Sequence, residues 1–338
     1  MVATIKVRNF HAVKDVLENF GVAPADALKR VGLDPNLFSN KENVVLYADA
    51  ARLVEECALL TNCDDFGLRV GMREDASAMG LTGLLSLSAM RVGEALQFIV
   101  AGLKTSDTGG VFAFEARNGS VFLSYIVVDG AAPSPEQLVD GAMAVACNTL
   151  RQFCGAEWRP DRVALTREPP RDPKPFRQFF GAPVDFGAPA AHLACPAAIL
   201  SRTVATHNPQ QLEILVPLFD AAVSQTRGDL VSTVRAVLKA QVSGGRLTRA
   251  RVAQAMGLTE HVLVYRLNEA GVAFSDLAEE VKNELARQML SAGKELRAIA
   301  GELGFADASA FSRAFLKWSG ETPGRWRADR ARMSVTEN

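Results

Sequence analysis

Apolar residues recur at helical spacing through the first hundred residues of the chain. Two groups show this spacing: Val13, Val16, Leu17 and Phe20, and Leu53, Val54, Cys57 and Leu60. Because residues three or four positions apart share one face of a helix, each group predicts an amphipathic helix with a buried face. Gly21 is expected to end the first helix, and Thr61-Asn62 the second, since glycine and asparagine tolerate the left-handed conformation of a helix terminus.

Strand-like segments begin near residue 111. Residues 111–117 and 121–128 are rich in Phe, Val and Ile, and Asn118-Gly119 between them is a preferred dipeptide of a type I′ hairpin turn. A helical pattern returns at 137–153 and stops at Gly155, and further short strands are expected at 162–166 and 191–194 around a Pro-rich stretch. These elements predict an α+β domain over residues 1–206.

A further helix is predicted over residues 207–228. Asn208 is its expected N-cap, Pro209 suits the first helical position, and an apolar stripe follows at Leu212, Leu215, Val216, Phe219 and Val223. This helix is interpreted as a linker or dimerisation helix. From residue 229 every segment has a helical pattern broken only by short turns that contain glycine, which predicts an all-α domain over 229–332 and a tail at 333–338.

The C-terminal domain contains an internal repeat at about 246–270 and 294–319. The equivalent positions are Val252 and Ile299, Ala253 and Ala300, Gly257 and Gly304, then, after one extra turn residue, Thr259 and Asp307, Leu263 and Phe311, and Leu267 and Phe315. In each copy a small residue allows two helices to cross closely, a glycine takes a sharp turn, and Thr or Asp caps the second helix. This is the pattern of a helix-turn-helix unit, and two copies are far more specific than one.

The second helix of a helix-turn-helix unit lies in the DNA major groove, with its apolar face turned inward. In the second copy the outer face presents two cations and hydrogen-bonding side chains, whereas the outer face of the first copy is poorer in positive charge. The candidate DNA-contacting residues are Arg249, Thr259, His261, Tyr265, Arg266, Ala308, Ser309, Ser312, Arg313, Lys317 and Arg327.

The run from Ile299 to Arg327, IAGELGFADASAFSRAFLKWSGETPGRWR, closely resembles the signature that ends the DNA-binding domain of AraC/XylS transcription regulators. The resemblance covers residues from about 229 to 332. It implies a long helix at about 274–291 that bridges the two units, so that both recognition helices enter successive major grooves about 34 Å apart. Arg is common in the family at the positions of His261 and Tyr265, which implies weaker base reading by the first unit.

The N-terminal domain resembles the arabinose-binding type of N-terminal domain found in ornithine-responsive and related AraC-type regulators. The resemblance rests on four segments: 31–34, 66–71, 79–87 and 179–186. It implies a domain that binds an effector and mediates dimerisation, with the identity of the effector and its binding residues open. Family resemblance also favours an activator that works with RNA polymerase.

Composition and charge add little to these motifs. Hydrophobic residues make up 48% of the chain and charged residues 22%, which is ordinary globular composition. Residues 229–338 hold sixteen Lys and Arg against thirteen Asp and Glu, a net charge of +3 that leaves −4 for the remainder. No apolar run approaches the roughly eighteen residues that span a membrane, so a cytoplasmic protein without a membrane partner is expected.

Catalytic and metal chemistry are not expected. The four histidines are scattered, no phosphate-binding glycine loop is present, and the five cysteines lack any CxxC pair. We therefore expect no enzyme activity, no cofactor and no metal, and interpret the cysteines as core residues. The predicted function is a DNA-binding transcription regulator, an effector-responsive homodimer that binds promoter DNA. The alternative is an effector- or partner-sensing adaptor that contacts DNA mainly through the second unit.

Overall fold

The computed structural model describes residues 3–128, 132, 134–225, 230–242, 248–256 and 260–327. The chain divides into two units, Met1–Gly228 and Asp229–Asn338. The boundary coincides with the end of the helix predicted at 207–228. In the described part of the chain, no helix combines the length and apolar character that crossing a membrane requires.

A helical layer opens the N-terminal unit, as predicted. Its elements are β1 (Thr4–Lys6), η1 (Val7–Phe10), α1 (Val13–Asn19), α2 (Pro24–Arg30), η2 (Leu37–Ser39), β2 (Val44–Leu46) and α3 (Tyr47–Thr61). The stripe residues Val13, Val16 and Leu17 are fully buried, and α3 ends at Asn62 with φ of 47°, in the left-handed conformation. The antiparallel pair of β1 with β2 was not predicted, because two three-residue strands are too short to show a period.

Short helices connect this layer to the main sheet. They are α4 (Phe66–Gly71), η3 (Ala76–Met79), α5 (Leu81–Ser88), α6 (Val92–Gly102) and η4 (Leu103–Thr105). Gly67 and Gly71 of α4 lie against the backbone of a later helix, α7 (Glu136–Cys154), where added Cβ atoms would come within 1.9 and 2.2 Å of carbonyl oxygens. The glycines of the 66–71 segment are therefore required for close helix packing.

Five strands form the main sheet in the order β3-β4-β7-β5-β6. The elements are β3 (Gly110–Arg117), β4 (Ser120–Val127), β5 (Arg162–Ala164), α8 (Lys174–Phe180), β6 (Val184–Asp185), β7 (Ala191–Pro196) and η5 (Ala197–Ser201). Asn118 and Gly119 have φ of 50° and 78°, so the type I′ hairpin is confirmed. Among the strands of the described residues, β5 and β6 alone pair in parallel. Helix α8, which begins at the end of the Pro-rich stretch, was not predicted.

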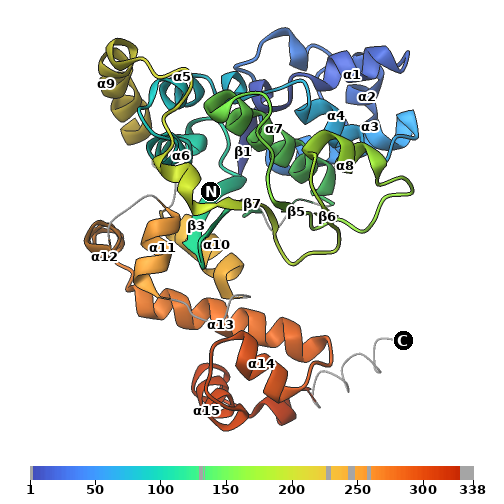
Figure 1. Cartoon of the computed structure of the whole chain (residues 1–338). Coiled ribbons are helices and arrows are strands. Elements are labelled where there is room, and N and C mark those ends of the chain that lie inside the picture. Colours follow the sequence, from blue (N-terminus) through green and yellow to red (C-terminus); the bar gives the residue numbers. More distant parts are fainter. Residues whose placement is uncertain are drawn as a thin grey trace. The chain divides into compact units, whose positions relative to one another are not determined.

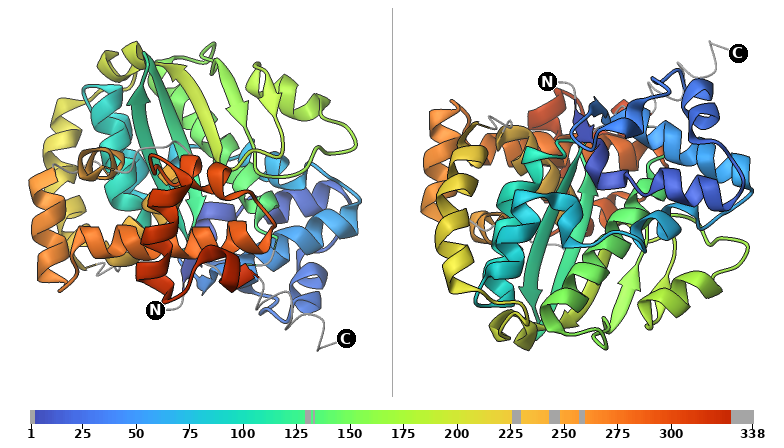
Figure 2. Two further views of the ribbon diagram at one scale, coloured as in Figure 1. Left: turned by 90° about the horizontal axis from the view of Figure 1, so that it is seen from below. Right: turned by 90° about the horizontal axis from the view of Figure 1, so that it is seen from above.

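Helices α6 and α7 cover one face of this sheet (Figure 2). Their apolar residues and those of β3 and β4 share a single core in which Leu96, Phe112, Leu123 and Leu150 are buried. The five cysteines of the chain are buried free thiols, and burial raises the pKa of Cys195 to about 12. This agrees with their interpretation as core residues.

The predicted helix near residue 208 is α9 (Pro209–Gln225), and it packs against α5 and α6 of its own unit. Asn208 caps it, because its Oδ1 accepts a hydrogen bond of 3.1 Å from the backbone N–H of Gln211. Phe219 is buried and meets Phe98 of α6 edge to face. Ile214 and Leu218 point outward and are more than half exposed.

The C-terminal unit consists, in its described residues, of helices only, as predicted (Figure 1). They are α10 (Leu230–Val242), α11 (Arg249–Ala255), α12 (Glu260–Glu269), α13 (Phe274–Ser291), α14 (Leu296–Glu302) and α15 (Ala308–Ser319). Helix α13 has the bounds expected for the bridging helix. It contacts both α14 and α15 of the second helix pair. It also contacts α10, which in turn contacts α11 and α12 of the first pair, so α13 bridges the two pairs.

Candidate nucleic-acid interface and interior cavity

The second helix pair, α14 and α15, has the turn that its sequence predicts. Gly304 adopts φ of 76°, and the backbone N–H of Phe305 donates a hydrogen bond of 2.8 Å to the carbonyl oxygen of Ala300. Asp307 then caps α15, because its Oδ1 accepts a hydrogen bond of 2.7 Å from the N–H of Ala310. Turn and cap together fix the angle at which α15 leaves α14.

An aromatic core holds α15 in place. Phe311 and Phe315 are fully buried, and their rings lie 5.8 Å apart. Trp326 packs edge to face on Phe315 at 6.2 Å, and Phe305 contacts Trp318 at 5.8 Å. The two tryptophans are thus part of the packing of this helix pair.

The opposite face of α15 is open to solvent. Ser309, Arg313, Leu316 and Lys317 are exposed at helical spacing, whereas Ala308 and Ser312 are half-buried beside them. The Ser312 hydroxyl donates a hydrogen bond of 2.8 Å to the carbonyl oxygen of Ala308. The structure therefore brings five predicted contact residues onto one side of α15: Ala308, Ser309, Ser312, Arg313 and Lys317.

The cations of this helix pair differ in their surroundings. No described residue forms an ion pair with Arg313. Lys317 pairs with Glu279 of α13 at 3.1 Å, and Trp318 donates to the same carboxylate. The hydrogen bond from Lys317 lowers the pKa of Glu279. Arg327 is half-buried and donates a hydrogen bond of 2.5 Å to the backbone carbonyl of Lys294, so its guanidinium also holds the end of the domain in place.

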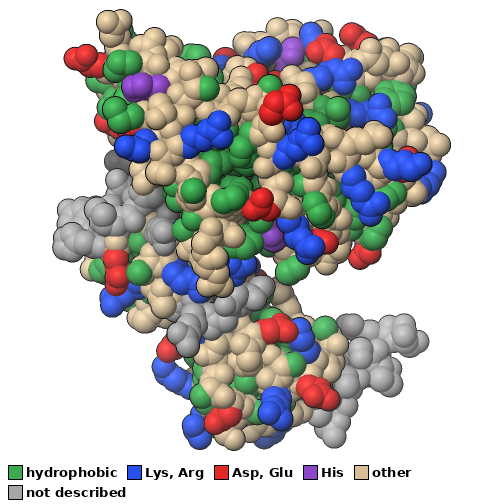
Figure 3. Space-filling view, in the orientation of Figure 1, with side chains coloured by type: hydrophobic (Ala, Val, Ile, Leu, Met, Phe, Trp, Pro, Cys, Tyr) green, Lys and Arg blue, Asp and Glu red, His purple; other side chains and the backbone are tan. Residues whose placement is uncertain are grey.

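The first helix pair consists of α11 and α12. Leu263 and Leu267 are fully buried, as the repeat predicts for the inner face of α12. Arg249 forms an ion pair of 3.2 Å with Glu260, which ties the start of α11 to the start of α12. Thr259 and the side chains of His261, Tyr265 and Arg266 lie outside the described residues. The face of the C-terminal unit seen in Figure 3 shows cations interspersed with carboxylates.

The N-terminal unit contains an interior cavity where its helical layer meets the main sheet. It encloses about 620 Å³ of empty space, counting the part that opens to solvent. Most of its lining is apolar, and the residues are Ile5, Asn9, Phe10, Val54, Gly67, Val70, Gly71, Ala78, Met79, Leu103, Asp107, Phe112, Tyr125, Gln137, Leu138, Gly141, Ala142 and Val145. An apolar lining with a few polar groups is typical of sites that bind small organic molecules.

A buried carboxylate forms part of the cavity wall. Asp107 Oδ1 accepts hydrogen bonds from the N–H groups of Gly109 and Gly110, and its Oδ2 accepts one of 2.7 Å from Tyr125. Because Tyr125 donates its hydroxyl hydrogen to Asp107, the hydroxyl of Tyr47, 3.1 Å away, donates to Tyr125. Burial raises the pKa of Asp107 to about 6, so the group is mostly ionised at neutral pH.

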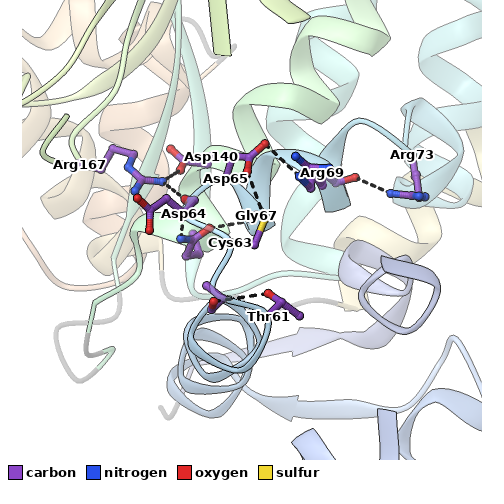
Figure 4. A network of polar contacts seen from close by, with 11 residues as sticks. Thr61, Cys63, Asp64, Asp65, Gly67, Arg69, Arg73, Asp140 and Arg167 are labelled. Atoms are coloured by element: carbon purple, nitrogen blue, oxygen red, sulfur yellow. Dashed lines mark hydrogen bonds and ion pairs between the residues drawn. The ribbon is translucent and has the colours of Figure 1, made fainter. Parts of the chain in front are cut away.

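Polar contacts beside the cavity fix α4 against α7 (Figure 4). Gln137 accepts a hydrogen bond of 2.7 Å from the N–H of Gly67, and Asp140 pairs with Arg167 at 2.7 Å. Burial raises the pKa of Asp140, and the cation of Arg167 opposes this shift. Arg69 pairs with Asp65 along its own helix and is partly exposed, which agrees with a solvated helix face.

The cavity could not be predicted from the sequence. Its lining residues come from ten separate segments, and most are apolar residues that look like ordinary core positions. Asp107 could have been noticed as an acidic residue next to Thr108-Gly109-Gly110, but only the fold shows that it is buried beside Tyr125.

Two protein-family models match the chain. One, described as the arabinose-binding domain of AraC transcription regulators, matches residues 21–204, and a helix-turn-helix domain matches residues 252–329. The ornithine utilization regulator of Pseudomonas aeruginosa is 24% identical over 326 residues, 96% of each chain. The transcriptional regulator VirS of Mycobacterium tuberculosis is 23% identical, again over 96% of each chain. The crystal structure of the regulator CdpR from Pseudomonas aeruginosa aligns with a TM-score of 0.46, at 24% identity, over 93% of this chain and 97% of that chain.

These matches and the paired helix-turn-helix units define a DNA-binding transcription regulator with an effector-binding N-terminal domain. The chain belongs to the AraC family of transcription regulators.

Proposed function

We propose that the chain is an effector-responsive activator whose two helix-turn-helix units read successive major grooves of promoter DNA. The exposed edge of α15 carries this proposal, because it places Ser309, Arg313 and Lys317 on one side of a helix whose other side is fully packed. Serine and the two cations suit base edges and phosphates. Thr259, His261, Tyr265 and Arg266 are proposed contacts of the first unit, together with Arg249.

The chain is proposed to act by binding and not by catalysis, as its relatives are regulators. We propose a homodimer, supported by the exposed Ile214 and Leu218 on α9, since solvent-facing large apolar residues at helical spacing favour self-association. Contact with RNA polymerase, and a location in the cytoplasm with the chromosome, accompany the activator role.

Arg313 offers the sharpest test. Fluorescence anisotropy would compare binding of the full chain to a fragment from upstream of its own operon with binding to a random duplex. Arg313→Ala is expected to weaken binding to the upstream fragment by about 1 to 3 kcal/mol and to relax preference at one base pair. Arg287→Ala, which removes an exposed arginine of α13, is the matched control and should change binding little. Equal loss on both duplexes would make Arg313 a phosphate contact and contradict base reading.

The alternative, an adaptor that touches DNA mainly through α15, is favoured by one observation. Arg249 is already paired with Glu260, which reduces the free positive charge of the first unit. A regulator that neutralises many phosphates loses affinity steeply as salt rises, because counterions are released on binding. A shallow salt slope together with preserved effector binding would support the adaptor instead.

A further inference from the structure

The cavity of the N-terminal unit has an unusual charge pattern. Among its lining residues Asp107 carries the only formal charge, and no lysine, arginine or histidine lines the wall. Asp107 is 3% exposed, and its hydrogen bonds all come from neutral donors. A buried carboxylate without a cation is costly, and a cationic ligand group would reduce that cost by forming a charge-assisted hydrogen bond.

The remaining polar side chains of the wall are already used. Gln137 binds the backbone of Gly67 and Asp64, and Asn9 donates to the carbonyl oxygen of Ser106. A ligand therefore meets a mostly apolar surface with one acidic position. An anionic group would face Asp107 with no positive partner, and the same holds for the carboxylate of a zwitterionic amino acid.

A second, smaller cavity shares part of the wall of the main cavity. Met79, Phe112 and Val145 line both the main cavity and a smaller one, which is otherwise formed by Leu96, Ile99, Leu123, Ala146, Thr149 and Leu150. The hydroxyl of Thr149 is buried there and has no hydrogen-bond partner among the described residues. Because methionine is flexible, Met79 can move aside for a longer ligand body.

From these observations we propose that this cavity is the effector site and that it takes an amine with an extended apolar body. The ammonium group lies against Asp107, and the body fills the apolar space toward Met79. This proposal rests on the proposed effector-responsive function and specifies the class of effector.

The test uses the full chain and three probes of equal length: octylamine, octanol and octanoate. A ligand that binds only the folded protein raises the midpoint of thermal unfolding in a saturable manner. Octylamine is expected to give the largest rise, octanol a smaller one and octanoate none. Shortening the amine from eight to six carbons should weaken binding by about fourfold for each methylene lost. A response to octanoate equal to that of octylamine, or no response to octylamine, would overturn the proposal.

Two variants connect the response to this cavity. Asp107→Asn keeps the shape of the side chain and should lower octylamine affinity at least tenfold while leaving octanol binding unchanged. Asp220→Asn, which removes an exposed carboxylate from α9, is the matched control and should bind as the unchanged chain does. If Asp107→Asn does not fold, Ala142→Leu adds bulk at a half-buried lining position and should reduce the response to both octylamine and octanol. Unchanged octylamine binding in the folded variants would refute the assignment.

Promoter binding measured without any probe distinguishes a wrong class of effector from a wrong function. If the chain binds its upstream fragment but ignores octylamine, the amine class is wrong and the regulator function stands. If it binds no fragment in any condition, the proposed function itself fails, whatever the thermal response.

Discussion

The substitution Ala300→Leu tests the packing that positions the second recognition helix. Ala300 lies in α14, is 1% exposed, and accepts the hydrogen bond from Phe305 that closes the turn before α15. Leucine adds three carbon atoms where two helices cross. Because the space is already filled, either α14 and α15 move apart or the side chain adopts a strained rotamer.

The expected cost is about 1 to 3 kcal/mol of unfolding free energy, the usual range for overpacking a filled core. For a unit of this size each kilocalorie lowers the melting midpoint by about 4 to 8 °C. Ala298→Leu is the matched control, because Ala298 lies on the same helix with its side chain exposed. Alanine and leucine have similar helix propensities, so this control should change stability by less than about 0.5 kcal/mol.

Tryptophan fluorescence can follow this helix pair selectively. The chain has three tryptophans, and Trp158 lies in the N-terminal unit. In a Trp158→Phe background the signal comes from Trp318 and Trp326, which both pack beside Phe305 or Phe315. Denaturant unfolding of the full chain should then show a lower midpoint for Ala300→Leu than for Ala298→Leu. Equal midpoints in the two variants would refute the packing argument.

Three other predictions concern charge and packing. Glu279→Gln should release Lys317 from its ion pair and steepen the salt dependence of DNA binding by up to about one unit of slope; an unchanged slope would count against phosphate contact by this lysine. Burial raises the pKa of Asp107 from 3.8 to about 6, so the folded chain binds the extra proton between these values and the unfolding free energy falls as pH rises through them. The unfolding free energy of Asp107→Asn, relative to that of the unchanged chain, should therefore rise by up to about 3 kcal/mol between pH 4 and pH 7. Urea unfolding measures this difference, and a difference that stays constant with pH would contradict the burial argument. Gly71→Ala places a Cβ 2.2 Å from a backbone oxygen of α7 and should cost about 1 to 3 kcal/mol, whereas Gly301→Ala, with open space around it, should be neutral or stabilising; equal effects would argue against the close helix crossing.

The DNA-binding unit could be predicted well because its constraints are local in the sequence. The glycine of a turn, the cap at Asp307 and the apolar pair Phe311 and Phe315 act within a few residues of one another, and the repeat shows each of them twice. The bounds of α13 were expected from the resemblance to AraC/XylS regulators. The hairpin at Asn118-Gly119 was predictable for the same reason, since two residues determine its turn.

The cavity and its acidic wall could not be predicted in this way. Asp107 and Tyr125 lie eighteen positions apart in the sequence, and Tyr47 lies seventy-eight positions before Tyr125. Only the fold brings the three residues together. Strands β1 and β2 and helix α8 were missed because short elements carry too little periodicity to show against a background of loops. Lys317 was predicted to face DNA, but its ion pair with Glu279 depends on how α13 crosses α15.

Hydroxyl-radical footprinting of the upstream fragment with the full chain shows whether the paired helix-turn-helix units bind promoter DNA. We expect two protected patches for each protomer on one face of the duplex, about one helical turn apart, and the loss of one patch when Ser309 and Arg313 are both replaced by alanine. Absence of protection at low ionic strength, with and without metabolite extract, would contradict this expectation.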